Sequence, residues 1–436
     1  MAPGLVGTAL ILLAILLGLL AGGVWIGIAL LAVGFAAMII VTDVPIGPVL
    51  ATTVWSSSAS WTLTALPLFI WMGEILFRTR LSEQMFRGLS PWLNWLPGRL
   101  LHVNVVGCGI FAAVSGSSAA TVATIGKIAL PELKKRGYDD MVSLGSLAGS
   151  GTLGLLIPPS IPMVVYAIAA NVSVIQVFLA GFLPGLMIMG LYSGYIMLWS
   201  LMNPGKSPPA EPRTSLLFKI RQSARLLPTV LLILFIFSAL LLGWATATEC
   251  AAWGVLGALV LAWWSGTLSW ATFLESVLAA TRLTCMIMLI LAGAAFTSAA
   301  MAFTGIPAAL AAWVDQLQLS PYVLIAVLTV MYIILGCLID GISMIVLTTV
   351  VVLPMIKQAG FDLIWFGVYL IILVEMAQIT PPVGFNLFVL QNMSGRDSFT
   401  VAKAAIPFFF LLVIGVVIIT IFPGIALYLP KLAFPD

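Results

Sequence analysis

The chain has 436 residues, of which 62% are hydrophobic and only 8% are charged, and its net charge is +3. No stretch between the apolar segments is long enough to bury a soluble core, so the composition excludes a soluble globular protein and predicts an integral membrane protein. The basic residues cluster in loops, which indicates membrane topology and gives no sign of a nucleic-acid partner.

The apolar segments predict an all-α polytopic fold. A helix needs about 20 apolar residues to cross the hydrocarbon core of a bilayer. We expect ten full spans, near residues 5–22, 24–42, 61–77, 141–170, 178–201, 226–243, 250–265, 282–304, 363–391 and 404–429. Two further apolar stretches, 101–133 and 322–356, are too long for one ordinary span and are interrupted near their centres, which favours re-entrant hairpins.

Four of these segments contain a break. The two hairpin segments are interrupted by SGSSAAT (Ser115–Thr121) and CLIDGIS (Cys337–Ser343), and two spans contain a Pro-Pro pair, in LIPPSIPMVVY (156–166) and ITPPVGFNLFV (379–389). Non-helical backbone at membrane depth is tolerated only where it is buried in protein or lines a wet cavity, so breaks indicate binding sites. A plain kink is the alternative for the Pro-Pro pairs, and close helix packing is the alternative for SGSSAAT.

The motifs of the first half recur in the second half at one constant offset in residue number, which indicates a tandem repeat. The offset superposes Pro131 on Pro354, Gly137 on Gly360, Asp139 on Asp362, Pro158 and Pro159 on Pro381 and Pro382, and Pro184 on Pro407. We therefore expect a first repeat at 1–203, a linker at 204–225 and a second repeat at 226–436. Five crossings per repeat is an odd number, so the second repeat is expected to be inserted upside down relative to the first.

Charge sets the expected orientation. Basic residues flank the first hairpin on both sides and also fill the linker, which places these segments in the cytoplasm by the positive-inside rule. Alternating the spans from there puts both ends of the second hairpin and both termini outside. The amphipathic segment RLSEQMFRGLSP (80–91) is expected to lie along the cytoplasmic surface as a brace for the first hairpin.

The hairpin tips and the broken spans should meet near the midplane. The first tip offers small hydroxyl residues together with exposed carbonyls, and at the repeat offset Asp340 takes the place of Ser117, with Ser343 nearby. These are hard oxygen ligands, and the Asp340 charge would be neutralised by Na⁺ or a proton. The alternative for Asp340 is a carboxylate held at a helix N-terminus or paired with a basic residue.

Glu375 lies one helical turn before the second Pro-Pro break. It either lines the cavity or pairs with a polar neighbour such as Gln378 or Asn386, and the sequence leaves both open.

Four motifs in this order resemble the large membrane subunit of tripartite ATP-independent periplasmic (TRAP) transporters, within the ion-transporter superfamily of elevator carriers. They are GSSAATVATIGKIALPELKKRGYD, GLLIPPSIPMVVYA, GCLIDGISMIVLTTVVVLPMI and ITPPVGFNLFVLQ, and the resemblance covers nearly the whole chain. It implies that the chain is a Na⁺-driven symporter of the bacterial inner membrane and is not an enzyme. The substrate would be a small organic acid, carboxylate or sialic-acid-like, received from a periplasmic binding protein.

The resemblance also implies site residues and a partner. A first Na⁺ site would use Ser115, Ser117, Gly154, Ile157 and Pro159, several through backbone carbonyls, a second would use Asp340, Thr380 and Val383, and the substrate cavity candidates are Ser118, Thr121, Ser343 and Asn386. The chain holds no additional four-span block, so we expect the small four-span subunit to be a separate chain.

Other classes fit less well. A self-sufficient Na⁺/carboxylate symporter of the same superfamily is the main alternative, and a requirement for a binding protein would separate the two. A channel needs a continuous polar pore, and an intramembrane enzyme needs a paired catalytic or metal constellation; the sequence offers neither.

Overall fold

The computed structural model describes residues 3–79, 81–206, 208, 215–224, 226–316, 319–337, 339–381 and 384–434, and every regular element in this part of the chain is a helix. An all-α fold was predicted. Its physical reason is that a helix satisfies its own backbone hydrogen bonds, which lipid cannot do.

The described residues of the first half form ten α-helices and one short 3-10 helix. These are α1 (Pro3–Ala21), α2 (Ile26–Val41), α3 (Ile46–Ser58), α4 (Trp61–Phe77), α5 (Leu81–Leu93), α6 (Leu100–Ser115), α7 (Ser118–Lys135), α8 (Asp140–Thr152), η1 (Leu153–Leu155), α9 (Ile161–Ala169) and α10 (Val174–Met202). The linker contributes η2 (Pro204–Lys206) and α11 (Leu216–Ser223).

The second half repeats this order. Its helices are α12 (Leu227–Leu241), α13 (Ala247–Trp264), α14 (Trp270–Thr304), α15 (Ile306–Gln316), α16 (Pro321–Gly336), α17 (Gly341–Gln358), α18 (Leu363–Gln378), α19 (Phe385–Ser394), α20 (Ser398–Ile421) and α21 (Gly424–Ala433).

The offset that superposes the sequence motifs also relates the helix bounds of the two halves. α7 maps onto α17 with identical ends, and the caps correspond: Ser117 and Asp340 are the N-caps of α7 and α17, and Asp139 and Asp362 are the N-caps of α8 and α18. Two large departures occur: α14 runs unbroken where the first half has α3 and α4, and α10 is one helix where the second half breaks between α20 and α21. The sequence repeat is thus also a repeat of local structure.

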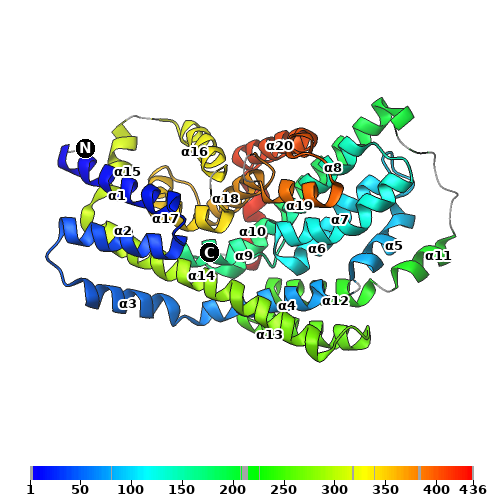
Figure 1. Cartoon of the computed structure of the whole chain (residues 1–436), viewed down its shortest axis with the longest axis horizontal. Coiled ribbons are helices and arrows are strands. Elements are labelled where there is room, and N and C mark those ends of the chain that lie inside the picture. The colour runs from blue at the N-terminus through cyan, green and yellow to red at the C-terminus, as the bar shows by residue number, and fades with distance from the viewer. Residues whose placement is uncertain are drawn as a thin grey trace.

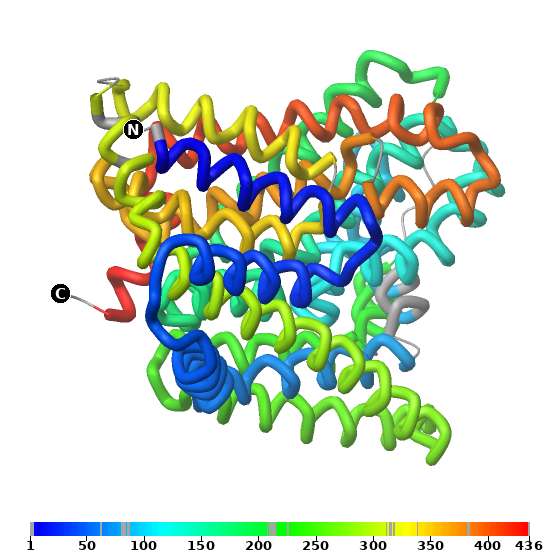
Figure 2. Tube along the Cα trace, turned by 60° about the vertical axis from the view of Figure 1, so that its left-hand side comes forward, coloured from blue at the N-terminus to red at the C-terminus, as the bar shows by residue number. Residues whose placement is uncertain are grey.

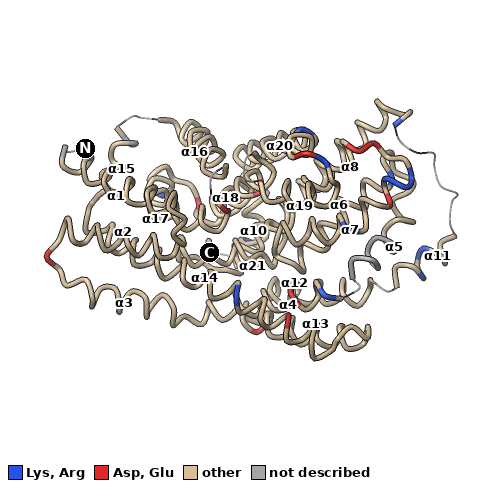
Figure 3. Tube along the Cα trace, in the orientation of Figure 1, with Lys and Arg blue, Asp and Glu red and all other residues tan. Residues whose placement is uncertain are grey.

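The two hairpins lie on opposite sides of the molecule. In Figure 1, α6 and α7 lie to the right and α16 and α17 to the left, with α9, α10 and α18 between them. Lys and Arg gather at the right-hand end, around α7, α8, α11 and the start of α20 (Figure 3). Both termini lie on the side away from the linker between α10 and α12 (Figure 2).

Two helices at the centre are buried over nearly their whole length. α18 is buried at every position from Trp365 to Gln378, and α8 at every position from Val142 to Thr152. α8 is rich in glycine and serine, which lets α20 approach closely: a Cβ at Gly145 would lie 2.2 Å from the carbonyl oxygen of Ala404. Each of these helices leads into one of the broken spans. The first break is buried at every position from 153 to 160, whereas Pro381 in the second break is exposed.

The observed spans differ from the expected ones in three places. The expected span 404–429 is wrong as a single helix, because the chain breaks at Phe422–Pro423 and continues as α21. The span expected at 282–304 begins at Trp270. α3 was not predicted at all: its Pro48 lies in the first turn, where proline is tolerated, and its Thr- and Ser-rich sequence looks like a loop.

Six of the described helices are long and apolar enough to cross a membrane, or up to eight if each bent pair forms one span. Ten spans were expected. Two of them, 141–170 and 363–391, are divided by their breaks into helices that are individually too short, and α2, with 16 residues, is also shorter than a full span. One of the six helices found, α17, belongs to the second hairpin.

Candidate functional site

The first hairpin turns sharply between α6 and α7. Gly116 ends α6 with φ 57°, in the left-handed region that favours glycine, and a Cβ there would lie 3.1 Å from the carbonyl oxygen of Pro159. Ser117 then caps α7, its hydroxyl accepting from the Ala120 amide at 3.4 Å. The tip of the hairpin therefore lies against the backbone of the first broken span.

An oxygen cluster forms at this tip. The Thr121 hydroxyl donates to the carbonyl oxygen of Ser117 at 2.7 Å, and the Ser115 hydroxyl lies 2.7 Å from that of Thr121 and 3.2 Å from the same carbonyl. A Cβ at Gly154 would lie 2.6 Å from the Ser117 carbonyl oxygen, so only glycine lets the two segments approach. Three oxygens of one chain segment thus converge beside Gly154.

The first broken span is buried throughout. α8 ends at Thr152, η1 follows, and after a cis bond between Pro158 and Pro159 the chain enters α9 at Ser160; every residue from 153 to 160 is buried. The Ser160 hydroxyl donates to the carbonyl oxygen of Leu155. A break with this burial has to be satisfied within the protein.

Four of the five residues predicted for the first Na⁺ site meet here, namely Ser115, Ser117, Gly154 and Pro159. The fifth, Ile157, follows η1, and its side chain lies between Gly109 of α6 and Gly185 of α10. The sequence argument that hairpin tip and broken span meet is therefore consistent with the geometry.

The second hairpin tip carries a carboxylate. Asp340 is the N-cap of α17: it accepts from the Ser343 amide at 3.1 Å and from the Ser343 hydroxyl. Asp340 thus lies at a helix N-terminus, which was the structural alternative to ion binding. These two hydrogen bonds leave other lone pairs of the half-buried carboxylate free, so capping and ion binding are compatible.

The second tip packs on the last turns of α18. A Cβ at Gly341 would lie 2.2 Å from Val374, and one at Gly336 would lie 2.4 Å from Ala377. Thr380 follows directly, its hydroxyl donating to the carbonyl oxygen of Met376 at 2.6 Å. Pro382 and Val383 lie outside the described residues, so the place of Val383 in the second site stays a prediction.

The substrate cavity candidates are engaged with one another or with the tips. The Ser118 hydroxyl donates to the Asn386 side-chain oxygen at 2.7 Å, and the Asn386 side-chain nitrogen donates to the carbonyl oxygen of Ala148 at 3.3 Å. Thr121 belongs to the first oxygen cluster and Ser343 to the Asp340 cap. All four side chains are buried, so a substrate would have to exchange these bonds for its own.

Glu375 is the polar residue whose surroundings the sequence did not settle. It is fully buried on α18, and neither carboxylate oxygen has a hydrogen-bond partner among the described residues. Neither of the polar neighbours that the sequence offered as partners, Gln378 and Asn386, therefore pairs with Glu375 in this arrangement, and Asn386 bonds Ser118 and Ala148 instead. No group of three or more His, Cys, Asp or Glu that could hold a metal occurs within the described ranges.

Comparison with known proteins gives one family and consistent relatives. The family model described as the DctM component of tripartite ATP-independent periplasmic transporters matches residues 13–425. The C4-dicarboxylate TRAP transporter large permease protein DctM of Pseudomonas aeruginosa is 32% identical over 88% of this chain and 89% of its own length. The isethionate TRAP transporter permease protein DctMQ of Oleidesulfovibrio alaskensis is 28% identical over 93% of this chain but 64% of its own.

A solved structure gives the same fold at low identity. The crystal structure of the Alcanivorax borkumensis YdaH transporter, described as having an unusual topology, matches with a TM-score of 0.68 and 12% identity, covering 93% of this chain and 98% of that one.

Proposed function

Since the chain belongs to the family of large membrane subunits, or DctM components, of tripartite ATP-independent periplasmic transporters, we propose that it carries a small organic acid across the bacterial inner membrane by Na⁺ symport. It receives the acid from a periplasmic binding protein and works with a small four-span membrane subunit that is a separate chain. Its relatives are named as transporter permeases, and the chain is a multi-pass membrane transporter and no enzyme.

The oxygen cluster at the first hairpin tip is the observation that carries this proposal. The Ser115 hydroxyl, the Ser117 carbonyl and the Thr121 hydroxyl converge within 2.7–3.2 Å of one another, beside the unwound Gly154–Pro159 segment. Hydroxyl and carbonyl oxygens are the ligands that hard cations prefer. Na⁺ bound by Ser115, Ser117, Gly154, Ile157 and Pro159 would hold the hairpin tip against the broken span.

The second site follows by the repeat. Asp340, Thr380 and Val383 occupy the equivalent hairpin tip and break, and the carboxylate adds one negative charge that favours a cation at membrane depth. Because α17 begins at Asp340 and the tip packs on the end of α18, an ion there would join hairpin and broken span as in the first half.

The substrate anion is expected between the two sites. The N-termini of α7, α9, α17 and α19 all follow breaks, and helix N-termini carry partial positive charge that attracts anions. Ser118, Thr121, Ser343 and Asn386 lie in the first turns of α7, α17 and α19 and can donate hydrogen bonds to a carboxylate. The substrate of the Pseudomonas relative, a C4-dicarboxylate, has this chemistry; a sialic-acid-like substrate shares the carboxylate.

Inverted repeats would supply the transport motion. The helix bounds that match at a constant offset, and the hairpins on opposite sides of α10 and α18, support a second repeat, 226–436, that is inverted relative to the first, 1–203. The basic linker 204–225 then lies in the cytoplasm. We propose that hairpins and broken spans move together as one unit, in an elevator motion against the outer helices.

A transport assay tests the proposal. The chain, its small subunit and a loaded binding protein are reconstituted in proteoliposomes, and we expect uptake of the acid only under an inward Na⁺ gradient and without ATP. If at least one more Na⁺ is carried than the anion has negative charges, an inside-negative potential should accelerate uptake, since it contributes about 2.3 kcal/mol per net charge per 100 mV. Equal uptake with K⁺ in place of Na⁺ would contradict the proposal.

The alternative, a self-sufficient symporter, differs in one outcome. It would take up the acid from free solution at the same rate with the binding protein left out. A DctMQ permease among the relatives, longer than this chain, supports instead a partner-dependent machine.

A further inference from the structure

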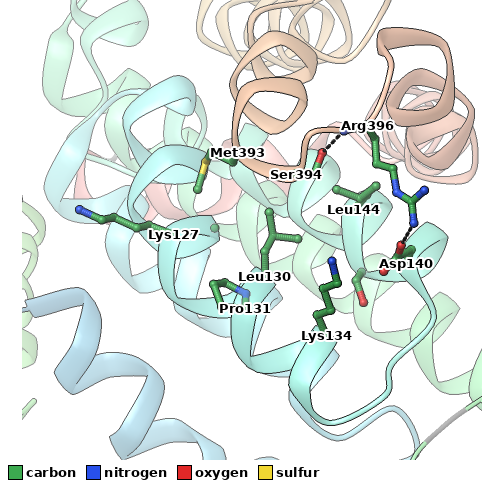
Figure 4. Close-up of a pocket in the computed structure, with 11 residues that line it drawn as sticks. Lys127, Leu130, Pro131, Lys134, Asp140, Leu144, Met393, Ser394 and Arg396 are labelled. Atoms are coloured by element: carbon green, nitrogen blue, oxygen red, sulfur yellow. Dashed lines mark hydrogen bonds and ion pairs between the residues drawn. The ribbon is translucent and has the colours of Figure 1, made fainter.

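A cavity of about 440 Å³ lies at the end of α7 that is remote from the hairpin tip. It is enclosed by the second half of α7, the first turn of α8 and the turn between α19 and α20 (Figure 4). Its volume falls in the range of about 300–1,000 Å³ that is usual for small-molecule sites. The lining residues are Gly126, Lys127, Leu130, Pro131, Lys134, Asp140, Ser143, Leu144, Met393, Ser394 and Arg396, and none of them belongs to the predicted Na⁺ sites.

The lining carries unbalanced positive charge. It holds three cations, Lys127, Lys134 and Arg396, and one carboxylate, Asp140, which forms an ion pair with Arg396. Neither lysine makes an ion pair among the described residues. Figure 4 shows Lys134 and Arg396 directed toward the space between α7 and the α19–α20 turn, with Lys127 at the rim. The excess of two positive charges favours an anion.

The rest of the lining suits a small organic molecule. Leu130, Leu144 and Met393 give an apolar floor. The hydroxyls of Ser143 and Ser394 already donate to the carbonyl oxygens of Asp139 and Leu390, so the cationic side chains are left to bind the anion. An anionic lipid would need an apolar groove for its acyl chains as well. The cavity offers only this short floor, so its composition matches a compact carboxylate better than a lipid.

The cavity and the midplane site share two helices. α7 runs from Ser118 at the tip to Gly126 in the cavity, and α19 runs from Asn386 to Met393 over a similar distance, about 12 Å at 1.5 Å per residue. A Cβ at Gly126 would lie 3.2 Å from the terminal methyl group of Met393, so the two helices stay in contact along this length. α7 comes from the first repeat and α19 from the second.

We propose that this cavity is a second anion site, which binds a small organic carboxylate from the cytoplasmic side without Na⁺ and inhibits transport. The inhibitory role and the side of entry rest on the proposed import function; the anion site itself does not. The bound carboxylate lies against Lys134 and bridges it to Arg396, with Lys127 adding long-range attraction. It joins α7 to the α19–α20 turn, opposes the separation of Ser118 from Asn386 and slows release of the next substrate, so that accumulated product reduces uptake.

Binding of succinate tests the site directly. Titration calorimetry on the purified complex of both membrane subunits, in choline chloride without Na⁺ or binding protein, is expected to show binding that Lys134→Gln weakens at least tenfold and Lys127→Gln weakens less. Lys135→Gln is the matched control, because Lys135 is exposed on the same helix and does not line the cavity; its affinity should equal that of the unchanged protein. Absence of succinate binding, or equal affinity in the Lys134 and Lys135 variants, would overturn the proposal.

A lipid source is distinguished by nanodiscs of neutral phosphatidylcholine with and without anionic phosphatidylglycerol. We expect the same Lys134-dependent succinate affinity in both. If phosphatidylglycerol abolishes succinate binding to the unchanged protein, the site belongs to a lipid headgroup and the proposal fails.

Uptake provides the second readout. Succinate loaded inside the vesicles should slow Na⁺-driven uptake by the unchanged protein and the Lys135 variant, and leave Lys134→Gln unaffected. If no Na⁺-driven uptake is found but Lys134-dependent binding persists, the transport proposal fails and the anion site stands; uptake that inside succinate slows equally in all three proteins would overturn the inhibitory role.

Discussion

Both hairpin tips place an N-cap residue at the start of the second hairpin helix, but the two caps differ in chemistry. In the first half Ser117 caps α7 through one long hydrogen bond of 3.4 Å, and in the second half Asp340 caps α17 through two bonds from Ser343. The break beside the first tip is buried at every position from 153 to 160, whereas Thr380 and Pro381 beside the second are partly or fully exposed. If both tips bind an ion, we therefore expect the uncharged site to depend on close backbone packing and the charged site to tolerate a looser surrounding.

The position of the glycines supports this interpretation. At the repeat offset, Gly154 of the first broken span corresponds to Ala377 in the second, and the second half instead places its glycine on the hairpin, at Gly336. In the first half a glycine of the broken span lets the hairpin approach, and in the second half a glycine of the hairpin lets the broken span approach. Of these two glycines, only Gly154 makes room for a carbonyl oxygen, that of Ser117.

The largest effect is expected from Gly154→Ala. The new Cβ would lie 2.6 Å from the Ser117 carbonyl oxygen and 2.8 Å from the Thr121 hydroxyl, so it displaces the oxygen cluster and should abolish Na⁺-driven uptake while the protein still inserts. Ala377→Gly is the matched control and should cost only about 1 kcal/mol of stability, as glycine does in a helix. Uptake by Gly154→Ala with unchanged Na⁺ dependence would break the comparison.

The second effect concerns the charge of Asp340. Asn caps helices as well as Asp, so Asp340→Asn keeps an N-cap on α17 and removes the charge, together with one of the two acceptor oxygens that face Ser343. We expect the Na⁺ concentration for half-maximal uptake to rise at least tenfold, about 1.4 kcal/mol, and Ser117→Ala to raise it less, since it removes one neutral ligand among several. A larger effect of Ser117→Ala than of Asp340→Asn would reverse the assignment of the charged site.

A smaller effect is expected at the bond between the halves. Ser118 and Asn386 are linked at 2.7 Å, yet their repeat equivalents are Gly341 and Met163, which cannot form a second bond of this kind. Ser118→Ala should reduce the free energy of unfolding by about 1 kcal/mol, and Asn386→Ala by about 1–3 kcal/mol because it removes the hydrogen bonds to both Ser118 and Ala148. The pair should couple in a double-mutant cycle followed by thermal unfolding in detergent; additive losses would mean that the bond contributes nothing.

The smallest effect separates two further caps. Ser173 is the N-cap of α10 in the first half, and Asp397 is the N-cap of α20 in the second half. Hydrogen bonds from the Thr400 hydroxyl and amide lower the pKa of Asp397 in the folded protein. The Asp397 carboxylate therefore stabilises the folded state above the unfolded pKa of about 3.9, and this stabilisation is lost as the pH falls through the lower folded pKa. Asp397→Asn should therefore remove a small part of the acid sensitivity of unfolding between about pH 5 and pH 2. Ser173→Ala should leave the pH profile unchanged, and a change there would argue against this origin.

Sequence patterns predicted the local structural features well, namely the helix breaks and the amphipathic helix. The breaks at Ser115–Thr121 and Cys337–Ser343 follow from glycine and hydroxyl residues within apolar runs, and α5 follows from its amphipathic pattern. Local signals of this kind act within a few residues, so one sequence is enough to reveal them. α3 was missed because its Thr, Ser and Pro residues resemble a loop, and its helix is set by packing against α14.

Contacts between the two halves could not be predicted from the sequence. Ser118 and Asn386 are 268 residues apart, and both were proposed as cavity residues without any sign that they bond each other. Likewise the burial of Glu375 without a partner among the described residues depends on which helices surround α18. Motifs named the residues of the site, but only the packing of α7, α8 and α19 decides which of them meet.

The unbroken helix α14 has a consequence for the surrounding lipid. Its 35 residues give a length of about 52 Å at 1.5 Å per residue, against about 30 Å for the hydrocarbon core. Even a tilt of about 40° leaves part of it outside, and Trp270 at its start is 76% exposed. The equivalent α3 and α4 are bent by 53°. α14 is one unbroken helix, so its length is fixed. We therefore expect a thicker or thinner bilayer to be accommodated by a change in the angle between α3 and α4.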